Sequence, residues 1–190
     1  DNNSDGLTME TSLKTIQHAA TIILADSLLP KTIYLENGVY SASTNGEIFP
    51  VIVPNNVSII GESEEGTILD AENNSDVMRC NGVNNSTISN ITITNGLSSY
   101  PGAGIYISNA ISNFTLENVT IADNESSYSG GGICIVLSNP TLINVTISDN
   151  ESSFWGGGIS IYNSNPALMD VTIIDNSTGS FGGGIYMLNS

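Results

Sequence analysis

A short acidic motif recurs along the second half of the sequence and supplies the residues best suited to bind a cation. Each copy places carboxylates beside an asparagine, and successive copies are 26 residues apart. The carboxylates are Asp123, Glu125, Asp149, Glu151 and Asp175. If the copies stack about 4.8 Å apart, neighbouring carboxylates repel by roughly 1 kcal/mol in water. A bridging cation with oxygen ligands at about 2.4 Å would remove this repulsion, so calcium is the natural candidate. The alternative is a solvated acidic edge that maintains solubility.

Aromatic residues precede a glycine-rich motif in the same part of the chain and are a second candidate site. Those before the glycines are Tyr100, Tyr128, Phe154, Trp155 and Phe181. Tyr162, like Tyr106 and Tyr186, is expected to face outward on the strand that follows the glycines. Flat apolar rings rimmed by serine and asparagine suit sugar rings as ligands. The same rings can instead pack on one another and seal a corner of the fold, and the sequence leaves both interpretations open.

The glycines themselves do not form a phosphate-binding loop. They open strands rather than helices, and no lysine follows them, so neither the P-loop nor the dinucleotide-binding pattern is met. They are better explained by backbone that turns tightly or lies close to neighbouring chain.

No catalytic constellation is visible in the sequence. The single histidine, His18, and Lys14 fall in a presumed N-terminal helix, while Lys31 follows it. Arg79 alternates with Met78 and Cys80 and is expected to point outward as a solvated charge. Since no nucleophile lies beside a base, this segment is not expected to be an enzyme itself.

The charge balance excludes several classes of partner. The 190 residues carry a net charge of −16, which repels nucleic-acid backbones and anionic lipid. No apolar run approaches the roughly 20 residues that span a bilayer. Scarce lysine with abundant asparagine, serine, threonine and glycine is typical of an extracellular or cell-surface protein. Two cysteines, Cys80 and Cys134, match neither a disulfide scaffold nor a metal-ligand spacing.

Two sequence motifs repeat in phase and reveal the elements that position these residues. The tetrapeptide GGGI occurs at 130–133, 156–159 and 182–185, preceded by GAGI at 102–105. Its companion reads NITI at 90–93, NVTI at 118–121 and 144–147, and DVTI at 170–173. A shared period of 26 residues indicates a stacked repeat architecture.

Each repeat contains short runs of alternating apolar residues and no pattern of helical period. Leu142 and Val145 lie three apart, so if both point inward the chain must bend at Ile143 and Asn144. The bend splits this run into two short strands, giving three strands and three turns per repeat. Such coils stack into a right-handed parallel β-helix with about 26 residues per coil.

Asparagines at equivalent positions are then expected to form columns along the axis. The column at the bend is Asn90, Asn118, Asn144 and Asp170, and a second is Asn95, Asn124, Asn150 and Asn176. The bend requires left-handed backbone, which asparagine tolerates. Stacked amides can hydrogen-bond to each other and to turn backbone.

The N-terminal third departs from the repeat. Ser12 can cap a helix with Leu13, Ile16, Ala20 and Ile23 on one face, which would cover the first coil. We therefore divide the chain into an N-terminal segment and capping helix at 1–31, irregular coils at 32–83, and regular coils at 84–190.

Several stretches resemble known families. The run from SLKTIQHAA through KTIYLENGVY, FPVIVPNNVSIIGE and GTILDA resembles the opening of bacterial secreted proteins with the pectin-lyase-like fold. In particular it resembles a family of uncharacterised function that begins with helix, strand, GVY and FP elements. The later units are similar to the GGA(I/L/V) and F-x-x-N repeats of chlamydial polymorphic outer-membrane proteins, with isoleucine in place of phenylalanine. These resemblances imply a β-helix of a secreted or surface protein. Polysaccharide lyases of this fold would imply calcium-binding carboxylates near a lysine or arginine base.

The sequence thus predicts one all-β domain, a right-handed parallel β-helix with an N-terminal capping helix. It is expected to be the N-terminal part of a longer bacterial protein. The leading function is a non-catalytic stalk or adhesin-like module that presents a repeated face to a polysaccharide or cell-surface glycan. The alternative is part of a polysaccharide lyase or glycoside hydrolase whose catalytic residues lie beyond this segment. The open last coil is expected to associate edge to edge through the strand at 184–188.

Overall fold

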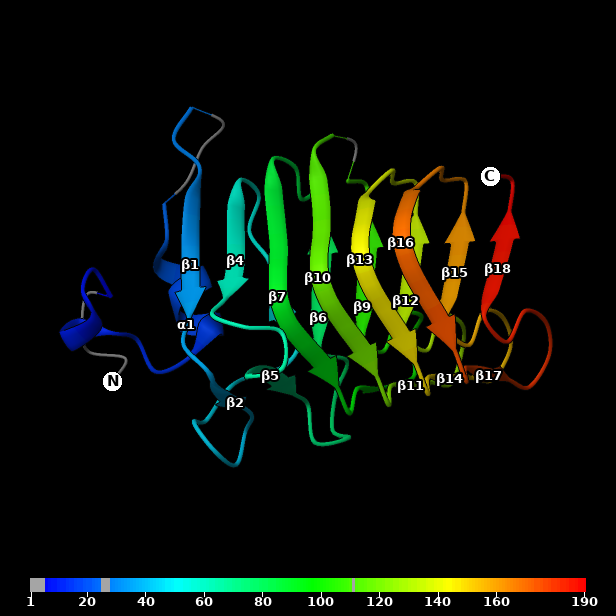
Figure 1. The fold of residues 1–190 in the computed structure, drawn as a ribbon, viewed down its shortest axis with the longest axis horizontal. Helices are drawn as coiled ribbons and strands as arrows, with labels where there is room; N and C mark the ends of the chain where they lie inside the picture. The colour runs from blue at the N-terminus through cyan, green and yellow to red at the C-terminus, as the bar shows by residue number, and fades with distance from the viewer. Residues whose placement is uncertain (1–5, 25–27, 111) are drawn as a thin grey trace.

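The predicted architecture is confirmed. The computed structural model describes residues 6–24, 28–110 and 112–190 as an all-β right-handed parallel β-helix of about six turns with about 26 residues per coil (Figure 1). Every strand pairs in parallel with its equivalent in the next coil. Repetition of one 26-residue unit therefore generates a rod in which each coil bonds mainly with the coils on either side.

Three sheets wrap around the core. Sheet A contains β1 (Lys31–Leu35), β4 (Val57–Gly61), β7 (Ser86–Thr94), β10 (Phe114–Ala122), β13 (Thr141–Ser148) and β16 (Ala167–Ile174), with β5 (Thr67–Asp70) paired to β7 and β2 (Gly38–Tyr40) paired to β5. Sheet B contains β3 (Val51–Ile52), β6 (Met78–Asn81), β9 (Ile105–Ser108), β12 (Ile133–Val136), β15 (Ile159–Tyr162) and β18 (Ile185–Leu188). Sheet C contains β8 (Leu97–Ser98), β11 (Glu125–Ser126), β14 (Glu151–Ser152) and β17 (Ser177–Thr178). In Figure 1, sheet A faces the viewer, sheet B lies behind it, and sheet C runs along the lower edge.

The bend within each coil lies where the sequence predicts it, but it does not break the strand. Asn144 has φ 50°, and the equivalent Asn118 has φ 52°. Pairing between β10 and β13 stops only at this residue, because Glu117 still pairs with Ile143 and Val119 with Val145. The prediction of two short strands here was therefore wrong. The third strand of each regular coil is instead the two-residue strand of sheet C, which begins at Glu125 in β11 and at Glu151 in β14.

Inward-pointing aliphatic side chains fill the coil. Leu142 and Val145 are both buried, as the bend requires, and Ile133 and Ile135 close the opposite side. Met78 and Cys80 also point into the core as predicted. Burying each such side chain contributes roughly 1.5–3 kcal/mol, and the same contribution recurs in every coil. The regular spacing of 26 holds from β10 onward, while the expected divisions at 31 and 83 stay predictions.

The asparagine column at the bend is confirmed as a ladder of side-chain hydrogen bonds. Asn118 Nδ2 donates to Asn90 Oδ1 at 3.0 Å, and Asn144 Nδ2 donates to Asn118 Oδ1 at 2.9 Å. Asn90 Nδ2 donates in turn to the Gly61 carbonyl at 3.3 Å. Because asparagine adopts left-handed backbone readily, one residue type serves both the turn and the ladder.

The second column is buried and differs from the prediction at one position. Asn124 and Asn150 are buried, and Asn124 Nδ2 donates to Asn150 Oδ1 at 2.9 Å. The residue of the preceding coil in this column is Gly96, whose backbone N donates to Asn124 Oδ1 at 2.8 Å. Asn95 instead precedes it, with φ 53°, in the left-handed position that Asp123 and its equivalents occupy. The assignment of Asn95 to the buried column was therefore wrong by one residue.

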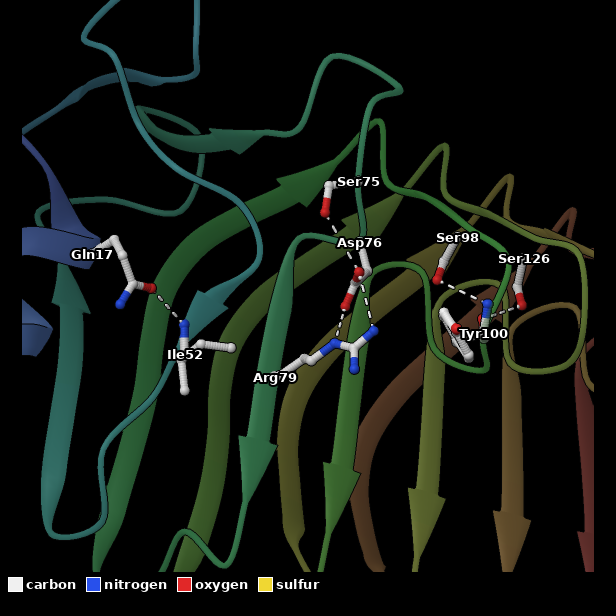
Figure 2. Close-up of polar contacts among 8 residues, drawn as sticks. All are labelled: Gln17, Ile52, Ser75, Asp76, Arg79, Ser98, Tyr100 and Ser126. Carbon is white, nitrogen blue, oxygen red and sulfur yellow. Dashed lines mark hydrogen bonds and ion pairs between the residues drawn. The ribbon is translucent and has the colours of Figure 1, made fainter.

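A short helix covers the first coil, as predicted, but starts later than expected. After a 3-10 turn, η1 (Met9–Thr11), the helix α1 spans Ile16–Ile22. Its N-cap is Thr15, whose side chain accepts from His18 N, and not Ser12. Ile16, Ala19 and Ala20 are buried against the core. Gln17 Oε1 accepts from Ile52 N at 2.8 Å, which joins the helix to the first strand of sheet B (Figure 2).

A buried carboxylate completes the helix cap, so we predict that Glu47→Ala lowers stability. Glu47 accepts from Ile16 N at 2.6 Å and from Gln17 N at 3.0 Å, two donors that the helix leaves unpaired. Removing it should lower the free energy of unfolding by roughly 1–3 kcal/mol, measured by urea denaturation. Glu65→Ala, at an exposed glutamate, is the matched control. Equal stability of the two variants would contradict this role.

The last coil leaves one face of the core uncovered. In it Val171 and Ile173 are only partly buried, and Ile185 in the edge strand β18 is exposed. Association through residues 184–188 stays a prediction. No helix within the described ranges is long and apolar enough to cross a membrane.

Candidate functional site

The outer face of sheet B brings the candidate ligand-binding residues together. Pairing of equivalent residues creates two outward columns on this sheet. The first is Ile52, Arg79, Tyr106, Cys134, Ser160 and Tyr186, and the second is Asn81, Ser108, Val136, Tyr162 and Leu188. Tyr106, Tyr162 and Tyr186 therefore face outward as expected.

Buried serines position the aromatic residues at the turn before sheet B. Ser98 Oγ accepts from Tyr100 N at 3.1 Å, and Ser126 Oγ donates to Tyr100 O at 2.9 Å (Figure 2). Ser126 Oγ also accepts from Tyr128 N at 3.0 Å. Trp155 is held by parallel backbone bridges to Ser129 and Phe181. The backbone of these ring-bearing residues is thus held by hydrogen bonds within its own coil and to neighbouring coils.

Five rings form one continuous group, which we call the aromatic cluster: Tyr128, Phe154, Trp155, Tyr162 and Tyr186. The ring centroids of successive neighbours are 5.7 to 6.0 Å apart. Trp155 and Tyr186 stack at 25° between planes, while Tyr128 meets Trp155 edge to face at 83°. Such pairs contribute about 0.5–1.5 kcal/mol each beyond burial of their area. The rings pack on one another, as one of the two interpretations predicts, and Tyr128 and Phe154 remain partly exposed, while binding of a sugar stays a prediction.

Cys134 and Ser160 lie on this same outward face but are completely buried. Burial raises the pKa of the Cys134 thiol to about 11, so the thiol stays protonated at neutral pH. Ser160 Oγ, in the next coil, has no regular hydrogen-bond partner among the described residues. Tyr162 lies close enough to interact electrostatically with Cys134, and burial is the main cause that raises the pKa of Tyr162. The small side chains therefore form a floor beneath the larger rings.

The structure separates two of the predicted aromatic residues from the cluster. Phe181 pairs with Trp155 through a backbone bridge, and its side chain is 67% exposed. Tyr100, also 67% exposed, lies one coil before Tyr128 and interacts instead with Arg79. The sequence did not indicate this arginine contact.

Arg79 points outward as expected, with its side chain 36% exposed, but it is paired with an acidic residue rather than free. Its Nε donates to Asp76 Oδ2 at 2.5 Å and its Nη2 donates to Asp76 Oδ1 at 3.3 Å (Figure 2). Its guanidinium carbon lies 5.8 Å from the centre of the Tyr100 ring. The hydrogen bond to Asp76 is the main cause that raises the pKa of Arg79. Asp76 is buried, so the arginine is held in place rather than free in solvent.

A cavity of about 170 Å³ lies beside this ion pair. Its lining residues are Arg79, Tyr100, Pro101 and Tyr106. We call it the Arg79 cavity. It combines a fixed cation with two tyrosine rings, one coil away from the aromatic cluster.

Apart from this ion pair the face is uncharged. Arg79 is the only charged residue in the six strands of sheet B. The flanking stretches 97–116, 126–148, 152–169 and 176–190 contain no charged residue either. The acidic residues of the regular coils are therefore confined to sheet A, sheet C and the corner between them.

The predicted metal ligands lie along that corner and are exposed. Asp123, Asp149 and Asp175 have φ of 57°, 56° and 54°, so the left-handed turn explains their type. Glu125 and Glu151 are directly paired neighbours in sheet C. Within the described ranges, no three His, Cys, Asp or Glu side chains are grouped so as to hold a metal ion. The calcium interpretation stays a prediction.

Comparison with solved structures supports the fold. The chain is similar to a pectin methylesterase from Yersinia enterocolitica, with 16% sequence identity and a TM-score of 0.53 over 90% of this chain and 67% of that one. A pectin methylesterase variant in complex with a hexasaccharide is also similar, with 14% identity and a TM-score of 0.48 over 88% of this chain and 64% of that one. The chain thus spans about two thirds of the length of these enzymes.

The sequence comparisons place the chain in a family. No curated protein matches the sequence. The resemblance to chlamydial repeats stays a prediction. The family described as "Protein of unknown function (DUF1565)" matches residues 1–189. This chain, a parallel β-helix with the fold expected of its opening residues, belongs to the DUF1565 family.

Proposed function

We propose that this chain is a non-catalytic carbohydrate-binding module, a rigid β-helical stalk of a secreted or cell-surface bacterial protein. The observation that carries the proposal is the aromatic cluster on the uncharged outer face of sheet B. Sugar rings present apolar faces to aromatic side chains and hydroxyl groups to polar ones. The cluster offers both, since three of its five rings are tyrosines and the Tyr162 hydroxyl donates to Ser129 Oγ at 3.3 Å.

The rigidity of the β-helix supports binding at this face. Phe154 and Tyr128 are each 45% exposed, and both stand on backbone that hydrogen bonds tie to neighbouring coils. A ligand that stacks on them therefore orders little of the protein, which reduces the entropic cost of association.

We predict that Trp155→Ala strongly weakens retention of glycan. Trp155 contacts Tyr128, Phe154 and Tyr186, so its removal disrupts the centre of the cluster. Central aromatic residues of binding sites contribute at least about 2 kcal/mol, so the affinity for a polysaccharide retained on a glycan array should fall more than about tenfold.

The matched control is Tyr34→Ala, which removes a 77% exposed ring from β1 in sheet A. Its binding should equal that of the wild type, and thermal denaturation should show that both variants are folded. If the wild type retains no glycan, or if folded Trp155→Ala binds as the wild type does, the proposal is wrong. Repeating the array with calcium and with a chelator tests whether calcium bridges the acidic corner.

A second candidate is part of a polysaccharide lyase or glycoside hydrolase whose catalytic residues lie outside this segment. The observation beside it is the likeness in fold to a pectin methylesterase, an enzyme of another reaction class that also acts on a polysaccharide, of which this chain covers 67%. Cleavage of polysaccharide by the natural full-length protein, but not by this segment, would support this candidate over a non-catalytic stalk.

A further inference from the structure

We propose that the Arg79 cavity is a sugar-binding subsite and that the ligand of the aromatic face is an uncharged polysaccharide, selected against acidic ones. This inference rests on the proposed function and adds the class of glycan. It depends on three observations: the charge of the face, the free donors of Arg79, and the alignment of the cavity with the aromatic cluster along the axis.

The charge distribution disfavours an acidic glycan. Asp76 neutralises Arg79, and no other charged residue lies on the strands of sheet B. The chain carries a net charge of −16, and exposed Glu125 and Glu151 line the neighbouring sheet C. Like charges repel over a screening length of about 8 Å at physiological ionic strength. A polyanion would therefore meet an acidic border without gaining an unpaired cation, whereas a neutral chain meets neither repulsion nor attraction.

Arg79 can still bind hydroxyl groups. A guanidinium has five N–H donors, and Asp76 receives one from Nε and one from Nη2. The other three have no protein acceptor among the described residues, and Figure 2 shows the remaining nitrogen pointing away from Asp76. These donors suit hydroxyl and ring oxygens of a sugar. Since Asp76 holds the guanidinium from the buried side, little side-chain freedom is lost on binding.

The Arg79 cavity lies one coil before the aromatic cluster, at an equivalent turn. Tyr100 forms one wall, and Ser126 bonds to the backbone of both Tyr100 and Tyr128. Successive coils are about 4.8 Å apart, so Tyr100, Tyr128 and Phe154 lie in line along the axis. A polysaccharide that runs parallel to the axis would contact Arg79 and Tyr100 first and the aromatic cluster next.

Affinity electrophoresis against matched polysaccharides tests the inference. The acidic probes are polygalacturonate and carboxymethyl cellulose, and the neutral partners are carboxyl-reduced polygalacturonate and hydroxyethyl cellulose, run beside neutral mannan and galactan. The wild type should be retarded by a neutral gel at least about tenfold more strongly than by the acidic ones. Raising the NaCl concentration to about 0.5 M should leave that retardation unchanged, because screening affects only charged pairs.

Asp76→Asn provides the discriminating variant. It removes the negative partner and leaves Arg79 as an unpaired cation, so the preference should shift toward the acidic gels by about fivefold or more and become salt-sensitive. Arg79→Gln should reduce retardation by neutral gels about tenfold. Since that change leaves Asp76 buried without its partner, Asp76→Asn combined with Arg79→Gln is measured as well. Lys31→Gln, which removes an exposed cation from β1, is the control for net charge.

The outcomes separate the two proposals. Two results would overturn the selection for neutral glycans but not carbohydrate binding itself. One is stronger retardation of the wild type by acidic gels than by neutral gels. The other is a ratio of neutral to acidic retardation that Asp76→Asn leaves unchanged. Absence of retardation in every gel would overturn both.

Discussion

Gly157→Ala is expected to prevent native folding, or to lower the free energy of unfolding by more than about 4 kcal/mol. A β-carbon at this position would overlap the backbone carbonyl oxygen of Ser177 and lie 2.5 Å from that of Gly183. Both atoms belong to the next coil, whose backbone pairs with β14 and β15. Separating the coils to admit a methyl group would break this pairing, so no small adjustment relieves the overlap.

The glycine triplet offers its own comparison. Gly156 has φ 63°, so it is required for its left-handed backbone, whereas Gly157 is required for space. Gly38→Ala is the control, because a β-carbon there would have no atom within 4 Å and its backbone is not left-handed. Its stability in urea should stay within about 1 kcal/mol of the wild type. A Gly157→Ala protein that unfolds at the same urea concentration as Gly38→Ala would refute the argument.

Asn150→Leu should have the second-largest effect, a decrease of roughly 3–5 kcal/mol in the free energy of unfolding. Asn150 Nδ2 donates to Ile121 O at 2.9 Å and to Ser148 O at 2.8 Å. It also donates to Asn176 Oδ1 at 2.9 Å, while Asn150 Oδ1 accepts from Asn124 N and Nδ2 at 3.0 and 2.9 Å. Leucine has similar bulk but removes all these bonds, and it leaves the buried Asn124 N without its acceptor in a site closed to water.

Asn144→Gly is the matched control from the exposed ladder. Its side chain donates one bond, to Asn118 Oδ1, and glycine keeps the left-handed backbone without strain. The free energy of unfolding of this variant should fall by no more than about 1 kcal/mol, measured by urea denaturation monitored by circular dichroism. Equal losses in the two variants would show that burial of the second ladder does not increase its contribution to stability, contrary to our argument.

Most of the architecture could be predicted from the sequence, because the repeat constrains it many times over. Each coil supplies its own copy of the GGGI and N-V-T-I motifs, so an error in one copy is corrected by the others. Errors arose where a single copy had to be interpreted. Asn95 belongs to a coil of 28 residues rather than 26. Alignment by residue type therefore matched it with Asn124, whereas the strand register matches it with Asp123. The start of α1 depends on Glu47, 31 residues from Ile16, which local capping rules do not detect.

The candidate site was predicted in part. Alternation along the strands placed the tyrosines outward, and the shared turn brought Tyr128, Phe154 and Trp155 together. The sequence could not predict which rings touch, because contact depends on side-chain rotamers. The sequence also could not predict the ion pair between Asp76 and Arg79. That pair depends on how the turn before β6 orients the Asp76 carboxylate toward the outward-facing guanidinium. The sequence could have predicted that sheet B is almost uncharged in an acidic chain, because the stretches between the acidic motifs contain no charged residue.

The two asparagine ladders also determine the steps in which this protein can change its length during evolution. Each ladder residue bonds to its equivalent in an adjacent coil, for example Asn144 to Asn118 and Asn124 to Asn150. Duplicating or deleting one whole coil returns every amide to an equivalent partner, so the molecule can be lengthened or shortened without a new contact being invented. Insertion of a single residue shifts every later amide out of register. Selection can therefore change the length of the outer face of sheet B only in increments of whole coils.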